Sequence, residues 1–166
     1  IEKLTFRRRS PRRGEIVVFN SPHAFDPLLS SSNRPSPFRC GLVNLPFLMY
    51  LPSIKHSACD AYIKRVVAIA GDEFFVNARG QMILNGERTL ETYISKYCDQ
   101  DGSQKTTCRS LKGRVPSSHV LVLGDNRSNS WDGRYWPGTA FVPESEIIGR
   151  AFWRFWPLNR IGSLTL

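Results

Sequence analysis

The chain has 166 residues, 41% of them hydrophobic, and a formal net charge of +9, which suffices for one domain with its own core but not for two ordinary ones. Eleven prolines, twelve glycines and four tryptophans argue against a helical bundle and favour strands joined by turns. No segment approaches the roughly 20 consecutive apolar residues that a membrane-spanning helix needs.

The predicted elements are almost all strands, spread along the chain. A turn at Arg13–Gly14 precedes the first of them, and residues 21–60 are interpreted as an insertion because their prolines disfavour regular structure. Asn85–Gly86 is the strongest hairpin signal, and residues 95–114 are predicted to form a polar loop. Strands are predicted at 15–20, 62–70, 73–78, 81–84, 87–90, 120–123 and 147–156.

These elements predict the fold class. Residues 143–147 offer at most a turn, and no amphipathic helix of useful length is present. We therefore expect a mainly β fold: one domain over residues 1–166, built as an antiparallel sheet or partly open barrel with large loops and an insertion.

The positive charge is concentrated at the N-terminus, where six of the first thirteen residues are Lys or Arg. Such a cluster commonly meets phosphate, either of nucleic acid or of anionic lipid headgroups, although a solvated basic arm is an equally open interpretation. The cysteines contain no C-x-x-C pair and the histidines are scattered, so the spacing of a zinc site is absent.

Three segments carry the chemistry. Residues 13–19 read RGEIVVF, residues 62–72 read YIKRVVAIAGD, and residues 124–136 read GDNRSNSWDGRYW. In this order they resemble three boxes of the type I signal peptidases: RGDIVVF, the box of the catalytic lysine, and GDNRxxSxDSRxxG. The sequence departs from the family's pattern at Glu15, Ala68, Ala70 and Gly133.

The resemblance continues through residues 147–166, which are similar to the cyanobacterial and thylakoid branch of the family. It implies a Ser–Lys protease that needs no metal or cofactor. Lys64 would be the general base and Ser130 would orient its amine. Supporting roles would fall to Arg65, Asp125, Asn126, Asp132 and Arg134, with Asp132 and Arg134 paired to brace their loop.

Lys64 is unusual even without the resemblance. Strand alternation would place it on one face with Tyr62, Val66 and Ala68, so it interrupts an apolar row. On the residues alone, a lysine at a sheet edge whose amine reaches water is the favoured explanation, and the resemblance reverses this preference. A general base must be neutral, however, and burial favours the neutral form. We therefore expect Lys64 to be mostly buried, with its amine in hydrogen-bonding reach of Ser130.

The nucleophilic serine has no counterpart in the sequence. The family carries it in an S-x-x-P-T segment upstream of the first box, after the membrane anchor, but only twelve residues precede Arg13 here. We expect both to lie outside this chain, and the chain alone to be inactive. Ser32–Ser36 fits the spacing loosely but lies inside the insertion.

The resemblance predicts a membrane-associated serine endopeptidase that removes N-terminal signal peptides on the periplasmic or lumenal side of a plasma or thylakoid membrane. Its partners would be signal peptides with a small-x-small cleavage site and the bilayer surface, not nucleic acid. In that setting Cys98 and Cys108 are predicted to form a disulfide, with Cys40 and Cys59 a weaker second pair. The alternatives are a non-catalytic homologue that binds membranes or signal peptides, a basic nucleic-acid-binding β module, and a different Ser–Lys peptidase.

Overall fold

The computed structural model describes residues 6, 9–29, 60–98, 108–154 and 158–164. The expectations for Cys40, Cys59 and the Ser32–Ser36 segment lie outside the described residues, as does half of the basic cluster. Within the described part, no helix is long and apolar enough to cross a membrane.

The fold is mainly β, as predicted, and the described residues contain no α-helix. Short 3₁₀ helices lie at Pro22–Ala24, Arg127–Asn129, Glu144–Glu146 and Leu158–Arg160. The strands are β1 (Ile16–Asn20), β2 (Ala61–Ile69), β3 (Glu73–Val76), β4 (Met82–Leu84), β5 (Glu87–Arg88), β6 (Leu111–Arg114), β7 (His119–Leu123), β8 (Phe141–Pro143), β9 (Ile147–Ala151), β10 (Trp153–Arg154) and β11 (Gly162–Ser163).

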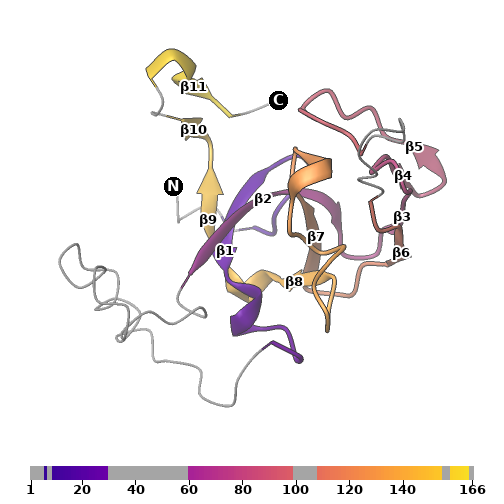
Figure 1. Cartoon of the computed structure of the whole chain (residues 1–166). Coiled ribbons are helices and arrows are strands. Elements are labelled where there is room, and N and C mark those ends of the chain that lie inside the picture. The colour runs from indigo at the N-terminus through magenta and orange to yellow at the C-terminus, as the bar shows by residue number, and fades with distance from the viewer. Residues whose placement is uncertain (1–5, 7–8, 30–59, 99–107, 155–157, 165–166) are drawn as a thin grey trace.

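The strands form three antiparallel sheets. The central sheet has five strands in the order β8-β7-β2-β1-β9, the second has four in the order β5-β4-β3-β6, and the third is the β10-β11 pair. Figure 1 shows the four-stranded sheet and the β10-β11 pair at separate sides of the central sheet. Strands β6, β8 and β11 were not predicted, and the strand expected over residues 147–156 is divided into β9 and β10.

The predicted hairpin turn between β4 and β5 has a clear local cause. Asn85 and Gly86 adopt positive φ angles of 51° and 86°. Positive φ at both central residues defines the tight turn whose twist matches the strands, and Asn and Gly adopt it at the least cost.

The core lies on both faces of the central sheet. Along β7, Val120 and Val122 pack on one face with Val17, Phe19 and Trp136. Leu121 and Leu123 pack on the other face against the four-stranded sheet, with Phe74, Val76 and Met82. Alternation along β7 therefore joins the two sheets, and burial of these apolar side chains is the main source of stability.

Strand β2 breaks the alternation that the sequence suggested. Ala68 was expected on the face of Lys64 and Val66, but it packs with Val67 in the core between the two large sheets. The reason is a register shift between Val66 and Ala68 in the ladder with β7, because a bulge moves the following residues to the other face. The expectation for Ala68 was wrong.

The same ladder places Lys64. Pairing of β2 with β7 begins at Arg65 and Leu123. The next residue of β2 towards its start is Lys64, and the next residue after β7 is Gly124, where the loop 124–138 begins. Lys64 therefore lies on a rigid central strand at the point where the neighbouring strand leaves it.

Candidate active site

Lys64 lies on the face of β2 that carries Tyr62 and Val66. Its side chain is partly buried, and its Nζ lies 5.9 Å from the centroid of the Tyr62 ring. Burial lowers the pKa of Lys64 below its ordinary value, and the negative charge of Asp132 offsets part of that effect. The environment thus favours a neutral amine, the form that can accept a proton.

Ser130 lies in the loop that begins at Gly124, but it forms no hydrogen bond with the Lys64 amine. Its Oγ is buried, has no hydrogen-bond partner among the described residues, and packs so closely on Gly124 that a Cβ there would overlap it. The expected hydrogen bond from Ser130 to Lys64 is therefore not formed in this structure. Gly124 contacts Ser130 and also lines the same groove as Lys64.

Asp132 and Arg134 form the ion pair that the sequence analysis expected. Both side chains are fully buried, and the Arg134 Nε and Nη2 donate to Asp132 Oδ1 and Oδ2 at 2.8 Å each. The backbone N–H of Gly124 donates to Asp132 Oδ2 at 3.0 Å. The pair therefore fastens the start of the loop, and a two-bond pair of this kind fixes orientation as well as distance.

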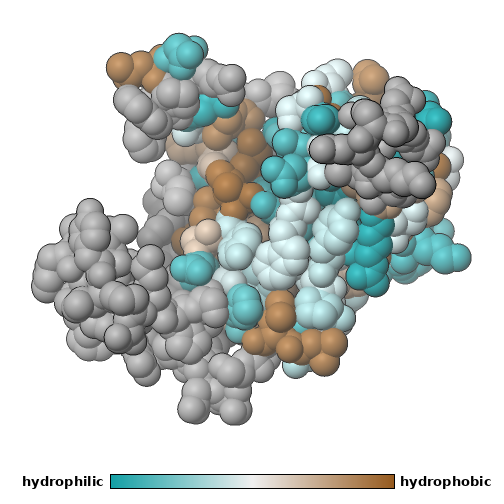
Figure 2. All heavy atoms as spheres, in the orientation of Figure 1, coloured by the Kyte–Doolittle hydropathy of each residue, from teal (hydrophilic) through white to brown (hydrophobic). Residues whose placement is uncertain are grey.

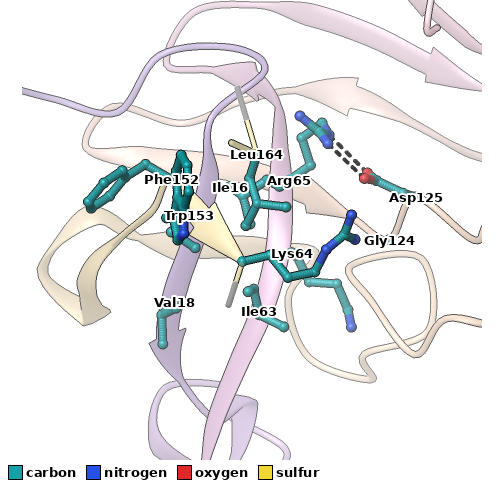
Figure 3. A pocket seen from close by; sticks show the side chains of 12 residues that line it. Ile16, Val18, Ile63, Lys64, Arg65, Gly124, Asp125, Phe152, Trp153 and Leu164 are labelled. Carbon is teal, nitrogen blue, oxygen red and sulfur yellow. Dashed lines mark hydrogen bonds and ion pairs between the residues drawn. The ribbon is translucent and has the colours of Figure 1, made fainter. Parts of the chain in front are cut away.

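Arg65 projects to the opposite face of β2 and clamps the beginning of the loop from there. Its Nε and Nη2 donate to the two carboxylate oxygens of Asp125 at 2.9 and 2.7 Å, and its Nη1 donates to the carbonyl of Gly14 at 2.7 Å (Figure 3). Its guanidinium also stacks 4.1 Å from the centroid of the Tyr93 ring. A guanidinium stays charged, so Arg65 acts here as a clamp and not as a base.

Asn126 shapes the loop itself. It is exposed, its Oδ1 accepts a hydrogen bond from Ser128 Oγ at 2.9 Å, and it forms a parallel bridge with Lys96. The backbone N–H of Arg127 donates to the Lys96 carbonyl at 2.8 Å. The segment around Lys96 is thus docked along the loop.

Sequence reasoning missed a second buried ion pair. Arg127 and Glu91 are both nearly inaccessible and bind each other through two nitrogens and two carboxylate oxygens. Arg127 stands in the GDNR motif, which is a usable signal, whereas nothing around Glu91 marks it. The Tyr93 hydroxyl donates to Glu91 at 3.0 Å, so this pair also reaches the Arg65 clamp.

The structure contains the disulfide between Cys98 and Cys108, whose Cα atoms are 5.8 Å apart. Both residues are buried. Arg134 Nη1 approaches Cys108 Sγ at 2.9 Å, and its Nη2 donates to the Arg127 carbonyl at 2.9 Å. The disulfide therefore packs against the braces of the loop and not against Lys64.

An apolar groove of about 650 Å³ lies beside Lys64. Its polar lining residues are Lys64, Arg65, Asp125 and Arg154, and its apolar ones include Phe152 and Trp153 (Figure 3). Figure 2 shows exposed hydrophobic surface in this region, beside the C-terminal hairpin. Lys64 borders this groove, and a lysine of lowered pKa next to apolar surface suits proton transfer on a peptide that is shielded from water.

The family comparison agrees with this geometry. The model of the family described as "Signal peptidase, peptidase S26" matches residues 1–156. The chain belongs to the signal peptidase family.

Similar proteins are described as signal peptidases or as a thylakoidal processing peptidase. The chain is 38% identical to a probable signal peptidase I-2 of Synechocystis and 36% identical to a signal peptidase I of Leptolyngbya laminosa, in each case over 99% of its length. It is 27% identical, over 96% of its length, to thylakoidal processing peptidase 1 of Arabidopsis thaliana. It spans 57%, 62% and 37% of these three relatives, respectively.

The fold comparison is consistent with the family. The crystal structure of a signal peptidase I from Enterococcus faecalis superposes with a TM-score of 0.53 at 20% sequence identity. The match covers 86% of this chain and 97% of that one. At this identity the likeness concerns the fold alone.

One departure from the signal-peptidase pattern has a steric explanation. Gly133 stands where the pattern has Ser, and a Cβ at this position would overlap the carbonyl oxygen of Ala140. Gly133 is buried, so the backbone approaches closely here and only glycine fits without a shift. The replacement therefore accompanies a close loop contact next to the Asp132–Arg134 pair.

Proposed function

We propose that this chain is the catalytic part of a type I signal peptidase of the cyanobacterial and thylakoid kind, which removes N-terminal signal peptides from exported preproteins. One observation carries the proposal: Lys64 is a partly buried lysine with a lowered pKa beside an apolar groove. Family membership and the relatives' names support the same activity.

The chemistry is that of a Ser–Lys pair. The neutral Lys64 amine takes the proton of a serine hydroxyl as the serine oxygen attacks the scissile carbonyl. The resulting ammonium returns that proton to the leaving amine when the peptide C–N bond breaks, which leaves an acyl-enzyme. Lys64 then takes a proton from water, whose oxygen attacks the ester carbonyl. As the ester C–O bond breaks, the Lys64 ammonium gives this proton to the serine oxygen, which releases the signal peptide and restores both residues.

The reaction also needs a serine nucleophile. The signal-peptidase pattern places it upstream of residues 13–19, and β1 carries those residues into the wall of the groove, since Ile16 and Val18 line it beside Lys64.

The substrate would bind as an extended strand. In the described residues, β7 pairs with β2 only from Arg65 onward, so this edge of the first residues of β2 has no neighbouring strand. An unpaired edge of this kind can bind a peptide through main-chain hydrogen bonds. Side chains of the peptide would then point alternately into the groove, consistent with a small-x-small cleavage site. The apolar Phe152 and Trp153 beside the groove fit a membrane-anchored protein with its catalytic domain on the periplasmic or lumenal side.

Cleavage of a preprotein by the full-length protein tests the proposal. Lys64→Ala should lower kcat/KM by about 10²–10⁴-fold, the usual contribution of a general base, whereas Ser130→Ala should only weaken cleavage. Lys112, exposed on β6, provides the control Lys112→Ala. Undiminished cleavage by the Lys64 variant contradicts the assignment. A wild-type protein that binds signal peptides without cutting them would instead be the non-catalytic homologue.

A further inference from the structure

Trp131 is a large apolar residue that the reaction as described does not use. It stands between Ser130 and Asp132, and 38% of it is exposed. In a turn built mainly of Gly, Asp, Asn and Ser, a tryptophan adds nothing to the backbone geometry. Its contacts therefore call for another role.

Those contacts form a closed ring of four aromatic side chains. Trp131 lies 5.8 Å from Tyr62 and 6.2 Å from Trp136, measured between ring centroids. Phe19 closes the ring at 6.0 Å from Trp136 and 6.3 Å from Tyr62. Tilted and edge-to-face pairs at these separations are the favourable arrangements for aromatic rings. The ring joins β1, β2 and both halves of the 124–138 loop.

Lys64 is the next residue on the same face of β2 after Tyr62. Its Nζ lies 5.9 Å from the Tyr62 centroid, so the Tyr62 ring forms one wall around the amine. That ring is only partly buried, and Trp131 packs on it from the side of the loop. Trp131 is the most exposed member of the ring, so it closes this cluster towards solvent.

We propose that Trp131 is a positioning residue for Lys64: its indole holds the Tyr62 ring beside the amine and keeps water from that side. The inference rests on the proposed function for its catalytic consequence, but the shielding itself is a property of this chain alone. Removing apolar surface from beside a partly buried amine admits water, which stabilises the charged form and raises the pKa. The face of the Tyr62 ring, which attracts the ammonium form, stays in the protein.

Other charged and titratable groups near Lys64 also influence its pKa. Asp132 follows Trp131 in the loop and favours the ammonium form of Lys64. Arg65, Asp125 and Arg154 line the same groove, and the His23 ring lies 6.4 Å from Trp131. A change at Trp131 leaves all of these side chains in the protein, so the shift that it causes can be separated from their contribution.

The test is an NMR titration of the Lys64 amine in this chain, with ¹³C-methylated lysines and Lys64→Arg to assign the signal. Trp131→Ala should raise the Lys64 pKa by about half a unit to one unit, which lowers the neutral fraction about threefold to tenfold below that pKa. Trp131→Phe should keep most of the wild-type value because a ring remains on Tyr62. Phe75→Ala is the matched control, since Phe75 is 39% exposed on the other large sheet.

The outcomes are separable. An unchanged Lys64 pKa in folded Trp131→Ala, or an equal shift in Phe75→Ala, overturns the inference. If Trp131→Ala does not fold, Trp131→Phe and Trp131→Leu decide: the pKa should rise more with Leu than with Phe, and equal values contradict the role. In the full-length enzyme the acid limb of the pH profile should move with the measured pKa. An inactive enzyme with the predicted shift would contradict the proposed function and leave the positioning role intact.

Discussion

The hydroxyl of Ser130 packs on the α-carbon of Gly124, so the residue that follows β7 and the residue that precedes Trp131 are in direct contact across the loop. Gly124 lines the groove that Lys64 borders, so this contact lies next to the candidate active site. The loop thus closes on itself at the candidate active site, and the contact leaves no room for a side chain at position 124.

Gly124→Ala is therefore predicted to displace Ser130. The overlap should lower the free energy of unfolding by about 1–3 kcal/mol, the usual cost of overpacking a well-packed site, and should reduce preprotein cleavage. Gly113→Ala is the control, because its Cβ would meet only the Phe74 ring at an ordinary 3.6 Å. Urea unfolding curves for the two variants check this, and equal stability losses would mean that the Gly124 contact is not tight.

Breaking the buried pair of Asp132 and Arg134 is predicted to cause a larger loss of stability. Asp132→Asn should cost about 3–5 kcal/mol because it leaves a fully buried guanidinium without its charge partner. The exposed pair of Glu73 and Arg114 is the control, with side chains 64% and 66% accessible. Glu73→Gln should change stability by less than about 1 kcal/mol. Similar effects of the two substitutions on urea unfolding would refute the buried brace.

Lys64 should make stability depend on pH in a defined direction. The pKa of Lys64 is lowered in the folded state, so between that pKa and the ordinary lysine value the unfolded chain binds the extra proton. Stability then rises with pH across this window. Lys64→Met should therefore be more stable than the wild type near neutral pH, and the difference should shrink as pH approaches the ordinary value.

Thermal unfolding of wild type and Lys64→Met at several pH values measures this, with Lys112→Met on β6 as the exposed counterpart. A difference that stays constant across the window would mean that Lys64 is not perturbed by folding.

The disulfide between Cys98 and Cys108 should contribute through the unfolded chain. It closes a short loop, with a sequence separation of 10, and restricting such a loop stabilises a protein by about 2–3 kcal/mol. Mass spectrometry after alkylation should find these two cysteines linked in the native protein. Free thiols at both positions in oxidised protein, or unchanged stability of the double serine variant, would contradict the prediction.

The positions of strands could be predicted only where the sequence signal is local. Strands β1, β2 and β7 are apolar runs bounded by turn residues, and each was found within one residue of its observed start. Strand β6, by contrast, contains Gly113 and two charged residues, and it is a strand because it pairs with β3. Strands β8 and β11 are three and two residues long, too short for a periodic pattern.

The candidate site likewise contains residues that the sequence indicates and contacts that only the fold creates. Lys64, Arg65 and the 124–136 loop were proposed as site residues because they resemble known boxes, and these roles remain predictions. The Glu91 carboxylate was missed because its partner, Arg127, is brought to it only by folding. The bulge that turns Ala68 away from Lys64 is likewise a property of the β2–β7 ladder, and single-residue shifts of this kind leave no mark in the sequence of one strand.

The pH dependence of preprotein cleavage by the full-length protein tests the central claim most directly, namely that neutral Lys64 is the base. The acid limb of kcat/KM should report the free enzyme's essential base and should coincide with the Lys64 pKa found by NMR, below the ordinary lysine value. An acid limb at the ordinary lysine value, or one that differs from the Lys64 titration, would contradict the account.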